Sequence, residues 1–202
     1  MNFVQQRHLI NSVQDFVSDY FEKYSNPSLI FHTIAHTRQV VEAAMEISLA
    51  SGLSVEEIEA VLIAAWFHDI GYCHTYEDHE TRSEQIATDF LLTKKLTIHQ
   101  MDSVHRCINV TRIPQQPVSL IQKVICDADL YHFSRIDYPA YAQALRTELE
   151  LNLNLCYQDR EWNTINYELL KDHKYFTTYG QNVLQTRKED NIEKLLQKII
   201  QL

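Results

Sequence analysis

Trp66-Phe67-His68-Asp69-Ile70-Gly71 is the stretch that decides how this chain of 202 residues folds. It closes the most apolar run of the sequence, residues 60–67, and a glycine follows two positions after the aspartate. A continuous apolar run predicts a buried segment, and glycine commonly ends a helix. We therefore expect an apolar core helix that delivers a histidine and an aspartate, both able to bind a metal ion, at its C-terminal end.

Helical spacing of apolar residues recurs along the rest of the chain. Val40, Ala43, Ala44 and Ile47 share one face of a second helix, and Ser54 begins the apolar helix with a capping box. Strict apolar–polar alternation, the mark of a half-buried strand, is missing. The pattern predicts an all-α fold of eight or nine helices. The expected helices cover residues 3–24, 36–50, 55–69, 81–92, 97–111, 119–133, 138–155, 161–179 and 188–202.

Composition narrows the class of protein. With three glycines and four prolines, the chain has little material for a glycine-rich phosphate loop, a dinucleotide fingerprint or a turn-rich β fold. The formal net charge of −9 and the lack of a basic stripe argue against nucleic acid as a partner. An acidic protein repels anionic substrates, so a phosphate ester would require a bound cation.

The cellular compartment follows from the cysteines and from the N-terminus. The cysteines are scattered, which predicts free buried thiols in a reducing compartment. The first ten residues have no apolar stretch suited to secretion, and residues 60–67 are too few for a bilayer span of roughly 20 residues. We expect a cytoplasmic protein that does not bind a membrane. The cysteines are Cys73, Cys107, Cys126 and Cys156.

Four side chains able to bind a metal ion recur in one structural setting. His36 opens a helix, His68 and Asp69 end the apolar helix, and Asp127 lies on the core-facing side of a later helix. One divalent cation would satisfy all four buried groups, and two imidazoles with two carboxylates suit manganese, iron, zinc or magnesium. Taken singly, each histidine is equally a hydrogen-bonded core residue, and Asp127 a turn cap or the partner of an arginine.

Four segments of the sequence resemble a known family. They are Phe-His-Thr-Ile-Ala-His at 31–36, Ala-Ala-Trp-Phe-His-Asp-Ile-Gly-Tyr at 64–72, His-Glu-Thr-Arg-Ser at 79–83 and Asp-Ala-Asp-Leu at 127–130. In this order they resemble the HD superfamily of metal-dependent phosphohydrolases, and in particular a branch of single-domain members.

The resemblance implies an all-helical fold in which His36, His68, Asp69 and Asp127 hold one metal ion. It implies a single domain over residues 1–202, with the core motifs in 31–130 and the C-terminal helices of 131–202 packed on them. It also implies hydrolysis of a small phosphate ester by a metal-activated water. We expect a nucleotide, and cyclic nucleotides, nucleoside mono- and triphosphates and alarmones all remain open.

The sequence departs from this family at one catalytic position. Some single-domain nucleotidases of the superfamily carry an acidic residue three positions after the aspartate of the central pair, where this chain has Tyr72. Catalysis would then fall to Glu80 as general acid or base, or to Glu77, or to the metal ion and Asp69 alone, with Asp69 orienting the water. Glu80 is equally an acid in the first turn of a helix. Asp129 lies about 200° around the helix from Asp127, which predicts a structural role.

Three residues are candidates for binding the substrate phosphate. His32 shares a helical face with His36, while Arg112 and Arg146 each offer a guanidinium group. Either arginine is equally a solvated or ion-paired residue. The expected partner is a small phosphorylated substrate. The apolar face of residues 188–202 either closes the core or forms a homodimer contact.

Two rival functions stay open at this point. The chain is alternatively a metal-stabilised nucleotide-binding or regulatory module without turnover, because Tyr72 replaces the acidic residue. It is alternatively a di-iron oxygenase, for which His79 and His105 are the only candidates for additional ligands.

Overall fold

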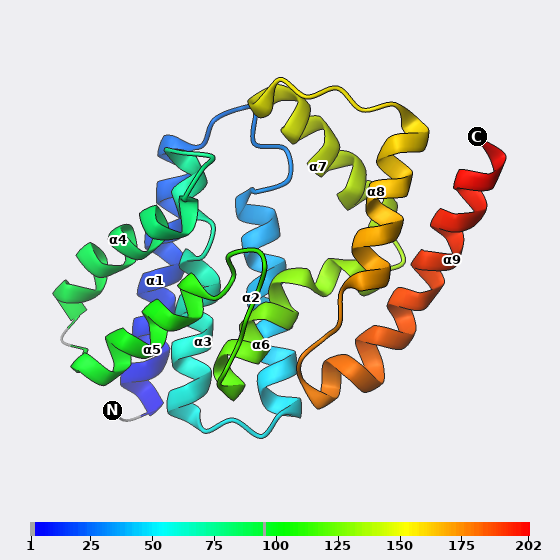
Figure 1. The fold of residues 1–202 in the computed structure, drawn as a ribbon. Helices are drawn as coiled ribbons and strands as arrows, with labels where there is room; N and C mark the ends of the chain where they lie inside the picture. The colour runs from blue at the N-terminus through cyan, green and yellow to red at the C-terminus, as the bar shows by residue number, and fades with distance from the viewer. Residues whose placement is uncertain (1–2, 95) are drawn as a thin grey trace.

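The apolar helix α3, Val55–Phe67, occupies the centre of the computed structural model, which describes residues 3–94 and 96–202 (Figure 1). Its first turn is closed by a capping box, in which Glu57 N–H donates to Ser54 Oγ at 3.3 Å and Ser54 N–H donates to Glu57 at 2.8 Å. Every residue from Glu59 to Phe67 is buried. Each large apolar side chain buried in this way contributes roughly 1.5–3 kcal/mol to stability.

Two helices pack against α3 and frame the site described below. They are α2, Ile34–Ala50, and α6, Leu120–Asp129, which also pack against each other. On the other side of α3 lie α1, Phe3–Tyr24, and α5, Ile98–Asn109, and α4, His79–Leu91, packs on α5 (Figure 1). The predicted all-α class is confirmed, and the described residues contain no strand.

The C-terminal third of the chain forms α7, Tyr138–Leu153, α8, Asp159–Asp172, and α9, Gln185–Gln201. It is tied to the 3₁₀ turn η3, Leu130–Ser134, which continues from α6. The side chain of Asn191 donates to the carbonyl oxygens of Phe133 and Arg135 at 2.9 and 2.8 Å. The fully buried Lys188 donates to the His173 carbonyl oxygen at 2.6 Å. The Asn191 contacts hold α9 against the end of η3, and the Lys188 contact holds it against the end of α8.

Two predicted helices end earlier than their apolar spacing indicates. The helix expected over 119–133 becomes a 3₁₀ turn after Asp129, and the helix expected over 161–179 ends at Asp172. In the second case the backbone of residues 176–177 donates to a buried carboxylate of α6 instead of continuing the helix. The chain becomes helical again in the π-turn η4, Gly180–Leu184, which leads into α9.

Two further expectations concern the membrane and the cysteines. Within the part of the chain that the structure describes, no helix is both long and apolar enough to cross a bilayer. All four cysteines are free, as expected, but only Cys107 and Cys126 are buried, whereas Cys156 is exposed. The prediction that all four thiols are buried is therefore wrong for Cys156 and for the half-buried Cys73.

Candidate metal centre

His36 is positioned by the first turn of α2. Thr33 is the N-cap of this helix, and its hydroxyl accepts a hydrogen bond from the backbone N–H of His36 at 3.4 Å. The ring of Phe31 packs on the imidazole, with ring centroids 4.7 Å apart. His36 is only 5% exposed, so its ring is held between α2 and the segment that precedes it.

His68 and Asp69 follow the last turn of α3. The backbone N–H of His68 continues the helical ladder to Ala64, and its Nδ1 lies 2.9 Å from the carbonyl oxygen of Ala65. Nδ1 therefore donates to that carbonyl, and the lone pair is left on Nε2. A ring held in this tautomer offers Nε2 to a cation.

A close backbone approach brings the next helix to this pair. A Cβ added at Gly71 would overlap the carbonyl oxygen of His79, so only glycine fits between this turn and the start of α4. The Gly71 N–H also donates to Ser83 Oγ at 2.9 Å. As a result His79 Nε2 lies 3.6 Å from Asp69 Oδ1.

The structure brings three of the four predicted metal ligands together. Asp69 Oδ2 lies 3.0 Å from His68 Nε2 and 3.4 Å from His36 Nε2. One donor atom from each of these residues lies within 4.8 Å of the other two, and all three residues are buried. These are three of the four side chains that the sequence analysis groups around one metal ion, and they join the start of α2 to the end of α3.

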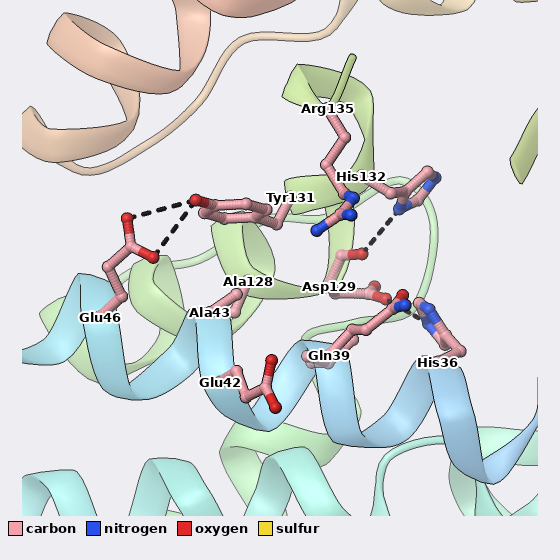
Figure 2. A pocket seen from close by; sticks show the side chains of 11 residues that line it. His36, Gln39, Glu42, Ala43, Glu46, Ala128, Asp129, Tyr131, His132 and Arg135 are labelled. Carbon is pink, nitrogen blue, oxygen red and sulfur yellow. Dashed lines mark hydrogen bonds and ion pairs between the residues drawn. The ribbon is translucent and has the colours of Figure 1, made fainter. Parts of the chain in front are cut away.

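The second carboxylate of the cluster, and its fourth side chain, belongs to Asp129. Its Oδ1 lies 3.7 Å from His36 Nε2, a pair that Figure 2 shows side by side. The same oxygen lies 3.6 Å from His68 Nε2. Gln115 Nε2 donates to Asp129 Oδ2 at 3.2 Å, and His132 Nδ1 donates to the Asp129 carbonyl oxygen at 3.1 Å. Asp129 is the last residue of α6, so the turn into η3 directs its carboxylate toward α2 and α3.

Asp127 corrects the sequence-based ligand set, because its carboxylate is engaged elsewhere. It accepts hydrogen bonds from Phe176 N–H at 2.8 Å and from Thr177 N–H and Oγ1 at 2.9 and 2.7 Å. A Cβ at Gly180 would overlap this carboxylate. Asp127 and Asp129 do point in different directions from α6, as their spacing predicts, but the assignment of the two roles was reversed.

The chemistry of the donor atoms fits a divalent metal ion. His68 Nε2 and Asp69 Oδ2 are buried and form no hydrogen bond within the described residues, although they lie 3.0 Å apart. Buried polar atoms without a partner are costly, and a lone pair facing a carboxylate is repulsive unless a proton or a cation lies between them. His36, His68, Asp69 and Asp129 would hold such an ion, with the nitrogen and oxygen ligands that first-row metals and magnesium accept.

The charges of the cluster are strongly coupled in the metal-free protein. Burial opposes the charged imidazoles, but the Asp129 and Asp69 carboxylates outweigh burial and raise the pKa of His36, and they raise the pKa of His68 further. Burial likewise opposes the carboxylates, but the two imidazoles outweigh it and hold the pKa of Asp69 and of Asp129 below the usual range. Without a metal ion the two histidines therefore hold their protons to higher pH than free imidazoles do.

Glu80 lies beside the cluster rather than in it. Its Oε1 lies 3.6 Å from His79 Nε2, and its Oε2 lies 3.5 Å from Arg112 Nη2. Arg112 forms closer contacts with Asp78 Oδ1 at 2.9 Å and Thr81 Oγ1 at 3.0 Å. Both residues thus stand near the metal centre, with His79 between Glu80 and the Asp69 carboxylate.

His32 is close to the cluster and is held by a carboxylate that the sequence analysis missed. Its Nδ1 is hydrogen-bonded to Glu148, whose other oxygen accepts the backbone N–H groups of Phe31 at 2.7 Å and of His32 at 3.0 Å. Glu148 lies on α7 and is fully buried. The His32 ring lies 6.1 Å from that of His36 and stacks on Tyr72 at 3.9 Å.

Arg146 and His105 do not join the site. Arg146 donates to Glu150 at 3.1 Å and to Asp159 at 2.7 Å, so the ion-paired alternative describes it and its predicted phosphate contact has no support in the structure. His105 lies 2.9 Å from Thr88 Oγ1 and 3.4 Å from Glu84. Of the two extra ligands that an oxygenase would require, only His79 approaches the metal centre.

Sequence reasoning missed Glu148 and Gln115, and it reversed the roles of Asp127 and Asp129. Glu148 lies 116 positions from its partner His32, so no local spacing links the two. Gln115 belongs to the loop between α5 and α6, where an isolated glutamine carries no pattern. The Asp-Ala-Asp segment at 127–129 offered a signal for the two aspartates, since it contains both carboxylates two residues apart. For Glu148 the signal was a weaker resemblance of residues 146–148 to the family.

Comparison with known proteins agrees with this geometry. The family model described as the HD domain matches residues 33–134, just over half of the chain. The chain belongs to the HD domain family. The matched segment includes His36, His68, Asp69 and Asp129 of the metal centre but ends before Glu148.

A solved structure confirms the fold of this HD protein. This chain is similar to the crystal structure of a predicted HD superfamily hydrolase from an uncultured Thermotogales bacterium, with a TM-score of 0.65 and 22% sequence identity. The match covers 100% of this chain and 99% of that chain. No curated protein matches the chain significantly.

Exchanging the two aspartates of α6 for asparagine tests the corrected ligand set. We expect Asp129→Asn to lower metal affinity at least tenfold, because a carboxylate facing both imidazoles is lost. We expect Asp127→Asn to retain the metal but to lower the free energy of unfolding by about 2 kcal/mol, since an amide cannot accept from all three donors. Metal content by mass spectrometry and urea unfolding measure the two effects. Metal loss in Asp127→Asn alone would restore the sequence-based assignment.

The affinity of the HD site for metal is expected to fall with falling pH. The raised pKa values of His36 and His68 mean that protons occupy the imidazoles in the metal-free protein, and a metal ion must displace them. We expect the apparent affinity for Mn²⁺ to drop by more than tenfold between about pH 8 and about pH 6. Calorimetric titration in two buffers of different ionisation enthalpy measures the released protons. A pH-independent affinity without proton release would contradict this prediction.

Proposed function

We propose that this HD protein is a metal-dependent phosphohydrolase that acts on a small phosphate ester of the nucleotide class. The observation that carries the proposal is the buried cluster of His36, His68, Asp69 and Asp129, in which a histidine nitrogen and a carboxylate oxygen are without a hydrogen-bond partner in the described residues. Membership of the HD family and the fold shared with a predicted HD superfamily hydrolase support it.

The residues of the cluster prepare the attacking water. When bound, a divalent metal ion lowers the pKa of a water molecule and polarises a phosphoryl oxygen. Asp69 presents Oδ2 to the two imidazoles and Oδ1 to His79, so it can both hold the ion and orient a water. Burial lowers the pKa of His79 although the Asp69 and Glu80 carboxylates oppose this shift. The ring is therefore neutral near pH 7 and can accept the proton of the attacking water.

Glu80 then has an indirect part in this reaction. Its carboxylate faces the same Nε2 of His79 at 3.6 Å and would stabilise that ring once it is protonated. Arg112, on the other side of Glu80, keeps this carboxylate directed toward His79. Glu80 therefore contributes to proton transfer indirectly, by stabilising the protonated His79 ring.

His32 is placed to protonate the leaving group. The buried Glu148 carboxylate binds Nδ1 of His32, which fixes the ring and leaves Nε2 free. Stacking on Tyr72 limits rotation of the imidazole, and Tyr76 donates to the same carboxylate at 3.1 Å. A histidine oriented in this way can give a proton to the departing oxygen of a phosphate ester. This replaces the phosphate contact that the sequence analysis expected of His32.

Phosphate release from a panel of nucleotides and simple phosphomonoesters, with Mn²⁺, Mg²⁺, Fe²⁺ or Zn²⁺ added in turn, tests the proposed activity. We expect release with at least one of these metals, and its loss on chelation and in Asp69→Asn. The matched control is Asp102→Asn, which removes an exposed acid that pairs with Arg106 on α5. A stoichiometrically bound metal without release from any ester would favour the nucleotide-binding module instead.

The role of His32 is tested by leaving groups of different basicity. We expect His32→Gln to lower kcat roughly 100-fold for alkyl phosphates, whose leaving oxygen needs a proton. The loss is expected to be small for p-nitrophenyl phosphate, whose phenolate departs without one. Glu148→Gln is expected to show the same selectivity with a smaller loss. Equal losses on both substrate types would mean that His32 only shapes the site.

A further inference from the structure

A groove runs along α2 away from the metal centre. His36 and Asp129 lie at one end, and Glu46 and Tyr131 lie at the other (Figure 2). Its volume is about 470 Å³, including the open mouth. The groove begins at two of the proposed metal ligands, so a phosphate ester bound there can extend its organic part along α2.

The α2 wall of the groove carries its polar side chains at helical spacing. Gln39, Glu42 and Glu46 lie three or four residues apart, so they share one face of the helix. Glu46 is already satisfied, because it accepts hydrogen bonds from the Tyr131 hydroxyl at 3.2 Å and from the Tyr179 hydroxyl. Its carboxylate closes the far end of the groove.

Glu42 is the carboxylate that remains available. Figure 2 draws no hydrogen bond or ion pair between Glu42 and the other side chains that line the groove. Gln39 beside it accepts a hydrogen bond from the Tyr141 hydroxyl at 3.0 Å. About 9 Å of helix axis separates His36 from Glu42, at 1.5 Å per residue. The groove therefore offers a free acceptor at a defined distance from the metal centre.

The arginine that lines the groove is ion-paired. Arg135 lines the opposite wall, but its guanidinium is bound to Asp137 at 2.8 and 3.1 Å and lies over the ring of Tyr141. Arg187 reaches the groove only through the Tyr131 hydroxyl at 3.4 Å, beside Glu46. Beyond the metal centre, the Glu42 carboxylate thus meets no unpaired positive charge on the facing wall.

We propose that this groove binds the organic part of a phosphomonoester that carries a hydroxyl or ammonium group for Glu42, and that it rejects polyphosphates. The inference rests on the proposed function, because the metal centre is taken to hold the phosphoryl group. Glu42 is exposed at the edge of the groove, so a second or third phosphate lying along α2 would pass its carboxylate, and like charges disfavour that position. A hydrogen-bond donor at the same place gains a charged acceptor, which strengthens the contact.

Non-hydrolysable phosphonates test the donor requirement without turnover. Calorimetry on the metal-loaded protein compares hexylphosphonate with hydroxyhexyl- and aminohexylphosphonate, which differ only in the terminal group. We expect at least one donor-bearing compound to bind about tenfold more tightly, and the one preferred identifies the donor as hydroxyl or ammonium. The preference is expected to disappear in Glu42→Gln. Equal affinities of all three compounds, or no binding of any, would overturn the proposal.

Hydrolysis rates test the exclusion of polyphosphates. We expect kcat/KM for a nucleoside monophosphate to exceed that for the matching triphosphate at least tenfold, and Glu42→Gln to narrow this ratio to about threefold or less. Glu193→Gln on α9 is the matched control, since it makes the same charge change at an exposed position outside the lining of the groove. A triphosphate preference, or a ratio that Glu42→Gln leaves unchanged, would overturn the inference.

The two proposals fail in distinguishable ways. Release of phosphate from p-nitrophenyl phosphate depends on the metal centre and not on a donor for Glu42. If that release occurs while the phosphonate and triphosphate preferences are absent, only the groove proposal fails. If no ester is hydrolysed although donor-bearing phosphonates bind more tightly, the hydrolase proposal fails and the groove proposal stands for a binding site.

Discussion

A buried imidazole and a buried carboxylate lie side by side at the end of α3, and the neighbouring helices must be placed so that this pair is stabilised. His68 is 0% and Asp69 is 4% exposed, and the atoms that face each other are without hydrogen bonds in the described residues. Such a pair is stable in an apolar core only when a cation or a proton joins it. The start of α2 and the end of α6 both deliver a further donor group to this point. The packing of the central helices is therefore also the assembly of the site.

Elements far along the chain complete this assembly. Glu148 on α7 organises the segment that leads into α2, because it binds the backbone of residues 31–32 as well as the His32 ring. Asp127 points to the opposite side of α6 from Asp129 and anchors residues 176–177 by three hydrogen bonds. The two aspartates therefore have different roles. Asp129 faces the candidate metal centre, and Asp127 binds the backbone of residues 176–177.

The sequence was most informative where chemistry and periodicity coincide locally. The apolar run and its His68-Asp69 end, and the helix opened by His36, are short-range patterns. Both the all-α class and the clustering of three candidate ligands could be predicted from them. Periodicity was less reliable at the end of α6. An ideal helix was assumed through residue 133, whereas the chain tightens into η3 after Asp129, and the deciding partner of Asp127 lies about 50 residues later. Contacts of long sequence separation, such as those of Glu148 and Gln115, leave no local periodicity from which they could be predicted. The partners of Arg146, Glu150 and Asp159, are close to it in sequence. The structure therefore agrees with the alternative prediction that Arg146 is ion-paired.

Because Asp127 binds a segment that lies beyond residue 134, it affects where the chain can be truncated without loss of structure. The segment that matches the HD family ends at residue 134 and holds every residue of the metal centre. A fragment cut at that boundary would nevertheless lack Glu148 and Thr177, leaving His32 without its carboxylate partner and Asp127 without its hydrogen-bond donors. A recombinant module or a chimeric graft of this site would have to include α7 and the segment through Gly180. The boundary of the sequence family and the boundary of the working unit are different points on this chain.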